Sequence, residues 1–147
     1  MTKEERADLA AQIKANGNNC CQAVALAFAD TVDVDDATLR RIASGFGLGI
    51  GCMEATCGAL VGAAMVAGLK TDSGATQVTK DILSRFKSKC GSTVCRELKG
   101  IDTGKVLCSC EDCVRNAVLA SETAKSPLIS ATPRRAMSGG CPQKPIR

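Results

Sequence analysis

The shortage of large side chains is the feature that most constrains how this chain can fold. Its 147 residues contain three phenylalanines and no tryptophan or tyrosine, so the apolar 45% consists mostly of alanine, valine, leucine and cysteine. A core of small residues suits closely packed helices, whereas a β-sandwich needs bulky β-branched and aromatic residues. The length also indicates one domain. We therefore expect an all-α fold, a compact bundle of short helices.

Capping residues and apolar periodicity predict about six or seven helices. Thr2 and Glu5 form a capping-box pattern before the first helix, and Asn18 or Asn19 precedes a second. No segment shows the alternation typical of a strand. The expected helices run to about residue 15, from 20 to about 31, through 39–43, from about 53 to 69, through 78–86, over 95–98, and from 108–113 to about 124.

A glycine-rich loop separates the third and fourth expected helices. Glycines occupy every second position from Gly45 to Gly51, which forbids a stable helix and lets the backbone approach another group closely. We interpret Gly49, Gly51 and Gly58 as candidates for contact with a bound cofactor. Gly58 and Gly62 lie four positions apart in the next helix, and tight helix packing explains that pair at least as well.

The composition of the C-terminal segment and the net charge indicate how far the domain extends and which partners it can bind. After residue 126, prolines and glycines replace the helical pattern, so we expect a domain at 1–125 and a flexible tail at 126–147. The net charge of +4 comes from scattered basic residues without a basic stripe. The N-terminus shows no apolar signal segment, and no apolar run is long enough to span a bilayer. We expect a cytoplasmic protein that binds neither nucleic acid nor membrane.

Ten cysteines and no histidine restrict the chemistry of the chain. In a reducing compartment, cysteines are more often metal ligands or redox groups than structural disulfides. Cys20, Cys95 and Cys110 fall at predicted helix N-termini, where the free N–H groups favour a thiolate. All-thiolate sites suit zinc, copper(I) or iron–sulfur clusters, and mixed Cys/His sites are excluded. Because the C-x-x-C at residues 110–113 has no second copy, the ligands must come from separate helices.

Four stretches of the chain resemble the family of redox-active proteins named for its C-GCAxxG-C-C pattern. The stretches are residues 19–24 (NCCQAV), 56–63 (TCGALVGA), 91–98 (GSTVCREL) and 110–117, in matching order, and the similarity extends from about residue 7 to 119. The resemblance implies a compact helical fold with four family cysteines, Cys20, Cys57, Cys95 and Cys110. It also implies redox partners, because related domains occur in split-Soret cytochromes, where an iron–sulfur cluster is bound.

One departure from the family pattern concerns the central motif. Glycine follows Cys57 instead of preceding it, so Gly51–Cys52 is a rival alignment. The positions of Ala59 and Gly62 favour Cys57. That cysteine is expected one turn inside the fourth helix.

The favoured interpretation is an iron–sulfur cluster-binding redox or electron-transfer protein. The cluster type stays open, a redox partner protein is expected, and homodimer formation is a further option. Two ligand arrangements stay open, a single four-cysteine cluster with the other thiols packed as small apolar groups, or an enlarged cluster that uses more. The candidate ligands are Cys20, Cys57, Cys95 and Cys110, with Cys52, Cys90, Cys108 and Cys113 as additional ones.

Two other functions also stay open. The chain could store copper(I) or zinc on thiolates, or act as a metal-free thiol–disulfide redox protein. We find no acid–base pair and no nucleophile–histidine arrangement, so the sequence leaves open whether the protein is an enzyme.

Overall fold

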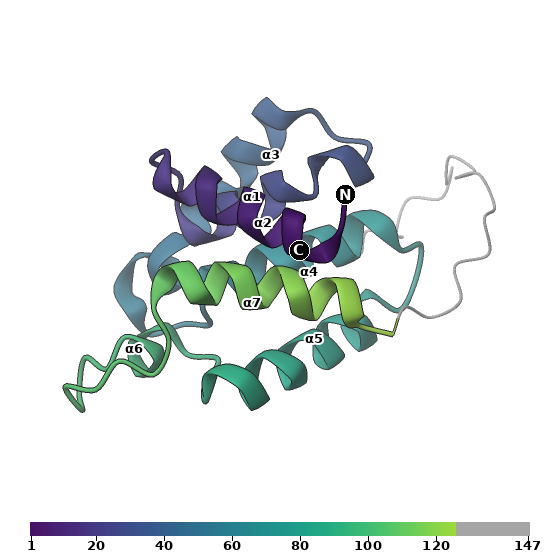
Figure 1. Ribbon diagram of the computed structural model, residues 1–147. Coiled ribbons are helices and arrows are strands. Elements are labelled where there is room, and N and C mark those ends of the chain that lie inside the picture. Colours follow the sequence, from purple (N-terminus) through teal and green to yellow (C-terminus); the bar gives the residue numbers. More distant parts are fainter. Residues whose placement is uncertain (126–147) are drawn as a thin grey trace, which may run out of the picture.

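Seven α-helices make up most of the part of the chain that the computed structural model describes, residues 1–125 (Figure 1). An isolated antiparallel bridge joins Thr56 and Val94, and no strand occurs within these residues. The all-α prediction is confirmed, whereas the expected tail and its Cys141 lie outside the described residues. The helices are α1 (Lys3–Ala15), α2 (Cys20–Ala27), α3 (Asp36–Ala43), α4 (Gly58–Lys70), α5 (Ala75–Cys90), α6 (Cys95–Leu98) and α7 (Cys110–Thr123), with short turns η1 (Ala29–Thr31), η2 (Ser44–Phe46) and η3 (Gly49–Met53).

Helix α2 is the centre of the packing. All its residues except Gln22 are buried, and it contacts α1, α3, α4 and α7. Asn19 caps it, because the Asn19 side chain accepts from the Gln22 amide and the Gln22 side chain accepts from the Asn19 amide. The two faces of α2 serve two apolar clusters, one around Val24 and one around Cys21. Its small side chains let four helices approach it at once.

Glycines in α4 allow the closest of these approaches. A Cβ atom on Gly62 would lie 2.6 Å from the Cys21 carbonyl oxygen of α2, nearer than real Cβ contacts occur. A Cβ atom on Gly58 would lie 2.8 Å from the Phe46 carbonyl oxygen. The helix-packing interpretation therefore holds for Gly62.

Helix α4 begins at Gly58, later than the expected start at Met53. Leu48, Ile50 and Met53 have φ of 55°, 57° and 62°, in the left-handed region. Side chains disfavour that region by roughly 1–2 kcal/mol per residue, and a right-handed helix cannot pass through it. The irregular segment thus extends beyond the glycines that predicted it.

Buried Arg6 ties together helices from both ends of the described chain. Its guanidinium donates to the Ala27 carbonyl (2.6 Å) and to both Asp30 oxygens (2.5 and 3.1 Å). It also lies 2.8 Å from the Glu122 carboxylate of α7 and 4.9 Å from the centre of the Phe28 ring. The result is that α1, the end of α2 and α7 are held in one arrangement. Figure 1 shows α7 running alongside α1 and α5.

No helix among residues 1–125 has both the length and the apolar composition needed to cross a bilayer.

Candidate functional site

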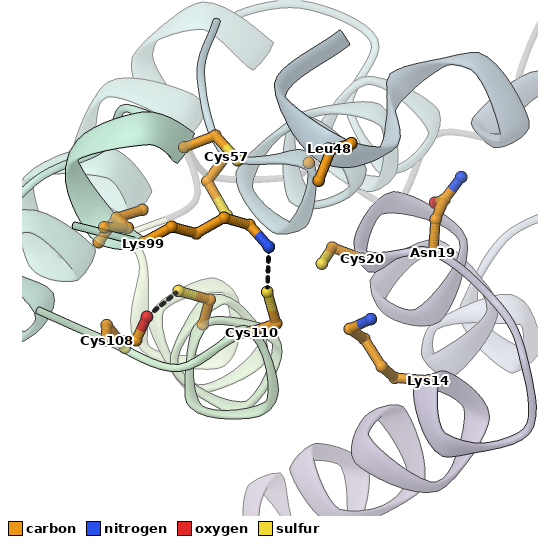
Figure 2. Close-up of a pocket in the computed structure, with 12 residues that line it drawn as sticks. Lys14, Asn19, Cys20, Leu48, Cys57, Lys99, Cys108 and Cys110 are labelled. Atoms are coloured by element: carbon orange, nitrogen blue, oxygen red, sulfur yellow. Dashed lines mark hydrogen bonds between the residues drawn. The ribbon is translucent and has the colours of Figure 1, made fainter. Parts of the chain in front are cut away.

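Six cysteines line one cavity of about 120 Å³ (Figure 2). A single water needs roughly 10–15 Å³ of such volume, so the cavity has room for a group of several atoms. Among residues 1–125, the lining includes two lysines and no carboxylate. The lining residues are Lys14, Asn19, Cys20, Leu48, Cys57, Gly58, Cys95, Leu98, Lys99, Cys108, Cys110 and Cys113.

Four of these cysteines stand where helices begin. Cys20, Cys95 and Cys110 are the first residues of α2, α6 and α7, as the sequence predicted, and Cys57 is the N-cap of α4. The expected place of Cys57 inside a helix was wrong, because α4 starts one residue after it. At the N-termini of α2, α4 and α7, unpaired N–H groups and the helix dipole favour negative charge in the cavity.

The isolated bridge fixes two of the cysteines relative to each other. The Cys57 amide donates to the Thr93 carbonyl (2.8 Å), and the Cys95 amide donates to the Ala55 carbonyl (3.1 Å). Gly49 packs behind this bridge, since a Cβ atom there would lie 2.7 Å from Cβ of Cys95. Two cysteines from separate helices are therefore held side by side by backbone bonds.

The three candidate glycines have different surroundings. Gly58 lines the cavity, and buried Gly49 makes space for Cys95 without lining it. Gly51 is exposed, and no atom lies within 4 Å of a Cβ placed there. Of the three, only Gly58 presents its backbone to the cavity.

Cys110 is the most acidic thiol of the site. A hydrogen bond from the Cys20 thiol and another from the Lys99 ammonium, 2.9 Å from the Cys110 sulfur, lower the pKa of Cys110 to about 5. The same hydrogen bond to Cys110, together with burial, raises the pKa of Cys20. Figure 2 shows Lys99 reaching across to Cys110, with Cys20 and Lys14 on the other side of that sulfur. At neutral pH the pair is thus a Cys110 thiolate beside a Cys20 thiol.

Cys57 and Cys113 form a second pair of interacting cysteines in the cavity. A hydrogen bond from the Cys113 thiol, together with the backbone N–H groups of Ala59 and Leu60, lowers the pKa of Cys57. The pKa of Cys113 is raised by this bond and by burial. Burial also raises the pKa of Cys95. The pKa is therefore lowered for two cysteines of the cavity, Cys110 and Cys57, and raised for Cys20, Cys95 and Cys113.

The comparison with known protein families bears on this cysteine set. Residues 18–123 match the family described as "Putative redox-active protein (C_GCAxxG_C_C)". The chain belongs to this family. The four cysteines that the resemblance singled out, Cys20, Cys57, Cys95 and Cys110, lie within the matched residues and all line the cavity. No curated protein and no solved structure matches the chain.

The additional cysteines of this family member divide into three groups. Cys108 and Cys113 line the cavity together with the four family cysteines. Cys90 does not line it but contacts the Cys108 sulfur. Cys52 is exposed on η3, with its sulfur 3.6 Å from the Gly49 carbonyl oxygen, and does not line the cavity. Cys21 faces the second apolar cluster, where its sulfur lies 3.6 Å from that of Met65. Sequence spacing alone does not separate Cys52 and Cys90 from Cys108 and Cys113.

Lys14 and Lys99 are site residues that the sequence reasoning missed. Lys99 follows Cys95 by four positions, or one helical turn, and this spacing is the signal from which it could have been predicted. The neighbouring Glu97 and Arg96 have other partners, because Glu97 accepts from the Ser92 hydroxyl and Arg96 donates to Asp102 (2.8 and 2.9 Å). Of the charged residues at 96, 97 and 99, only Lys99 lines the cavity.

Proposed function

We propose that the cavity binds an iron–sulfur cluster through Cys20, Cys57, Cys95 and Cys110, and that the protein exchanges electrons with a partner protein. One observation carries the proposal: four cysteines from the starts of four helices meet at a single cavity that also holds two lysines and no carboxylate. A thiolate-ligated cluster is anionic, and this lining compensates negative charge.

The shape of the site favours a cluster over a single ion. A tetrahedral thiolate site with metal–sulfur bonds of about 2.3 Å needs sulfurs roughly 3.8 Å apart around one point. Among residues 1–125, no group of three or more potential ligands converges in this way. A polynuclear cluster needs ligands around a volume and not around one point, and six cysteines line the cavity of about 120 Å³.

Residues of the chain would bind this cluster and adjust its reduction potential. Cys110 and Cys57 supply the two sulfurs whose pKa is lowered, and the thiols of Cys20 and Cys95 would lose their protons on ligation. Lys99 donates to the Cys110 sulfur, and the Ala59 amide stabilises the Cys57 sulfur. Such bonds to ligating sulfurs raise a reduction potential. One-electron transfer is the chemistry that a cluster supplies when bound.

Cys108 and Cys113 enter the proposal as two alternatives. They line the same cavity, so an enlarged cluster would use them, whereas a four-ligand cluster would leave them as packed thiols. Counting iron, together with titrating free thiols in the loaded protein, distinguishes the two. The proposal also assigns the protein to the reducing cytoplasm, where its thiols stay available.

The test is iron and sulfide analysis of protein purified without oxygen. Wild-type protein should be brown and contain both elements, and Cys57→Ser should lose most of them. Cys21→Ser is the matched control, because Cys21 is equally buried but faces away from the cavity. Colourless protein loaded with zinc or copper, or equal iron loss in both variants, contradicts the proposal.

A second function is favoured by the Cys20–Cys110 pair. An acidic thiolate hydrogen-bonded to a thiol is the arrangement of a nucleophile and its resolving cysteine. The Cys110 sulfur would attack a partner's disulfide and form a mixed disulfide with it. The Cys20 sulfur would then attack the Cys110 sulfur, which releases the reduced partner and leaves a Cys20–Cys110 disulfide. Redox titration of metal-free protein followed by peptide mapping should find that disulfide if this function holds.

A further inference from the structure

Cys90 and Cys108 form a pair of contacting thiols that the four proposed ligands leave unused. Their sulfurs lie 3.4 Å apart, and both side chains are buried, with 4% and 9% exposed. Cys90 is the last residue of α5, and Cys108 lies in the loop before α7. The contact therefore joins two separate elements of the fold.

The backbone around the pair is held in place independently of the sulfurs. A Cβ atom on Gly91 would lie 3.5 Å from a Leu107 methyl group, in ordinary contact. The amides of Leu107 and Cys108 donate to the Leu98 carbonyl at 3.0 and 3.3 Å. A disulfide has sulfurs about 2.05 Å apart, so the 3.4 Å pair needs to close by only about 1.4 Å.

The two thiols differ in how a reagent reaches them. Cys108 lines the cavity, and Cys90 lies behind it and does not. A molecule as small as hydrogen peroxide can enter a cavity of about 120 Å³ and meets Cys108 first. From this geometry we infer that Cys90 and Cys108 are a redox-active dithiol, which small hydroperoxides oxidise to a disulfide.

The chemistry proceeds in two balanced steps. The Cys108 sulfur attacks one peroxide oxygen, the O–O bond breaks, and the thiol proton leaves with the released hydroxide as water, giving a sulfenic acid. The Cys90 sulfur then attacks the Cys108 sulfur, the S–O bond breaks, and the second water carries away the Cys90 proton. Two thiols lose two electrons, and one peroxide becomes two waters. A low-molecular-weight dithiol returns the pair to its reduced form.

Cys113 is the rival partner for Cys108. Its sulfur lies 3.7 Å from the Cys108 carbonyl oxygen, and its side chain interacts with those of both Cys57 and Cys108. The direct sulfur–sulfur contact at 3.4 Å favours Cys90 over this rival. None of these steps needs a metal, so the oxidation is expected of the metal-free protein, whose cavity gives peroxide access to Cys108.

The test is peptide mapping of the reduced full-length chain after one equivalent of hydrogen peroxide. Free thiols are blocked with iodoacetamide before digestion without reductant. We expect a Cys90–Cys108 linked peptide, distinct from the Cys20–Cys110 peptide of the other thiol pair, and we expect dithiothreitol to reverse it. Iron measured in the same samples reports separately on the cluster. Absence of the linked peptide, or a main disulfide from Cys113, overturns the inference.

Variants identify the order of the two steps. Cys90→Ser should trap Cys108 as a sulfenic acid, labelled by dimedone several-fold more than in wild-type protein. Cys108→Ser should leave Cys90 unlabelled, and Cys21→Ser should behave as wild type. Equal labelling of Cys108 with and without Cys90 overturns the inference, and mapping of the wild type decides the matter if a variant fails to fold.

Discussion

Replacing Lys99 by methionine tests the electrostatics of the cavity directly. The Lys99 ammonium lies 2.9 Å from the Cys110 sulfur, where two unit charges interact by about 1.4 kcal/mol in water and about 6 kcal/mol at an effective dielectric constant of 20. These limits correspond to changes of about one and about four in pKa. Cys110 is half-buried, so we expect an intermediate effect, a rise of about two.

The consequence is a large loss of thiolate in mildly acidic solution. The pKa of Cys110 is about 5 in the wild type, and a rise of about two would reduce the thiolate fraction at pH 6 from about 90% to about 10%. The assay is the rate of iodoacetamide alkylation at Cys110 from pH 4 to 9 in metal-free protein, resolved by peptide mass spectrometry. The alkylation rate at pH 6 should fall by nearly tenfold.

Two further variants control for this prediction. Lys99→Arg keeps the charge and should keep most of the acidity. Lys105→Met removes the same net charge from an exposed residue outside the cavity and should leave the Cys110 profile unchanged. The reasoning is refuted if Lys99→Met leaves the midpoint in place, or if Lys105→Met moves it equally.

Three other predictions concern the fold. Gly62→Ala should destabilise the protein by about 1–3 kcal/mol because its Cβ would meet the Cys21 carbonyl of α2, whereas Gly68→Ala, in open space on the same helix, should stabilise by about 0.5–1 kcal/mol. Urea unfolding of the two variants should show opposite signs. Arg6→Met should cost about 2–4 kcal/mol, lowering the urea midpoint by about 1–2 M, and a loss under about 0.5 kcal/mol would contradict the role given to Arg6. Arg6 lowers the pKa of Asp30, so the stability from that pair is present above the unfolded pKa of about 3.9 and is lost as pH falls through the lower folded value. The stability gap between wild type and Arg6→Met should accordingly be smaller at pH 3 than at pH 7.

Local signals carried most of the fold prediction. The capping box at Thr2 and Glu5 and the cap at Asn19 both form, because each depends on residues within one helical turn. The left-handed residues Ile50 and Met53 were not foreseeable, since isoleucine and methionine carry no preference for that conformation.

The candidate site was predictable only in part. Helix starts and the family resemblance selected Cys20, Cys95 and Cys110, and the structure brings all three to one cavity. The sequence did not separate Cys52, which is exposed, from Cys108, which lines the cavity. That difference depends on where the loops before α4 and α7 turn, which no local spacing records.

The wide spacing of the four helix-start cysteines has a consequence for how the protein matures. They occupy positions 20, 57, 95 and 110, so the set is incomplete until α7 has been synthesised and has packed against α1. In a zinc finger, nearby ligands capture a metal first and the metal drives folding of the loop. Here the chain must fold before its cysteines share a cavity. Delivery of a cluster would then be a separate step, made to a finished fold by whatever donor supplies it.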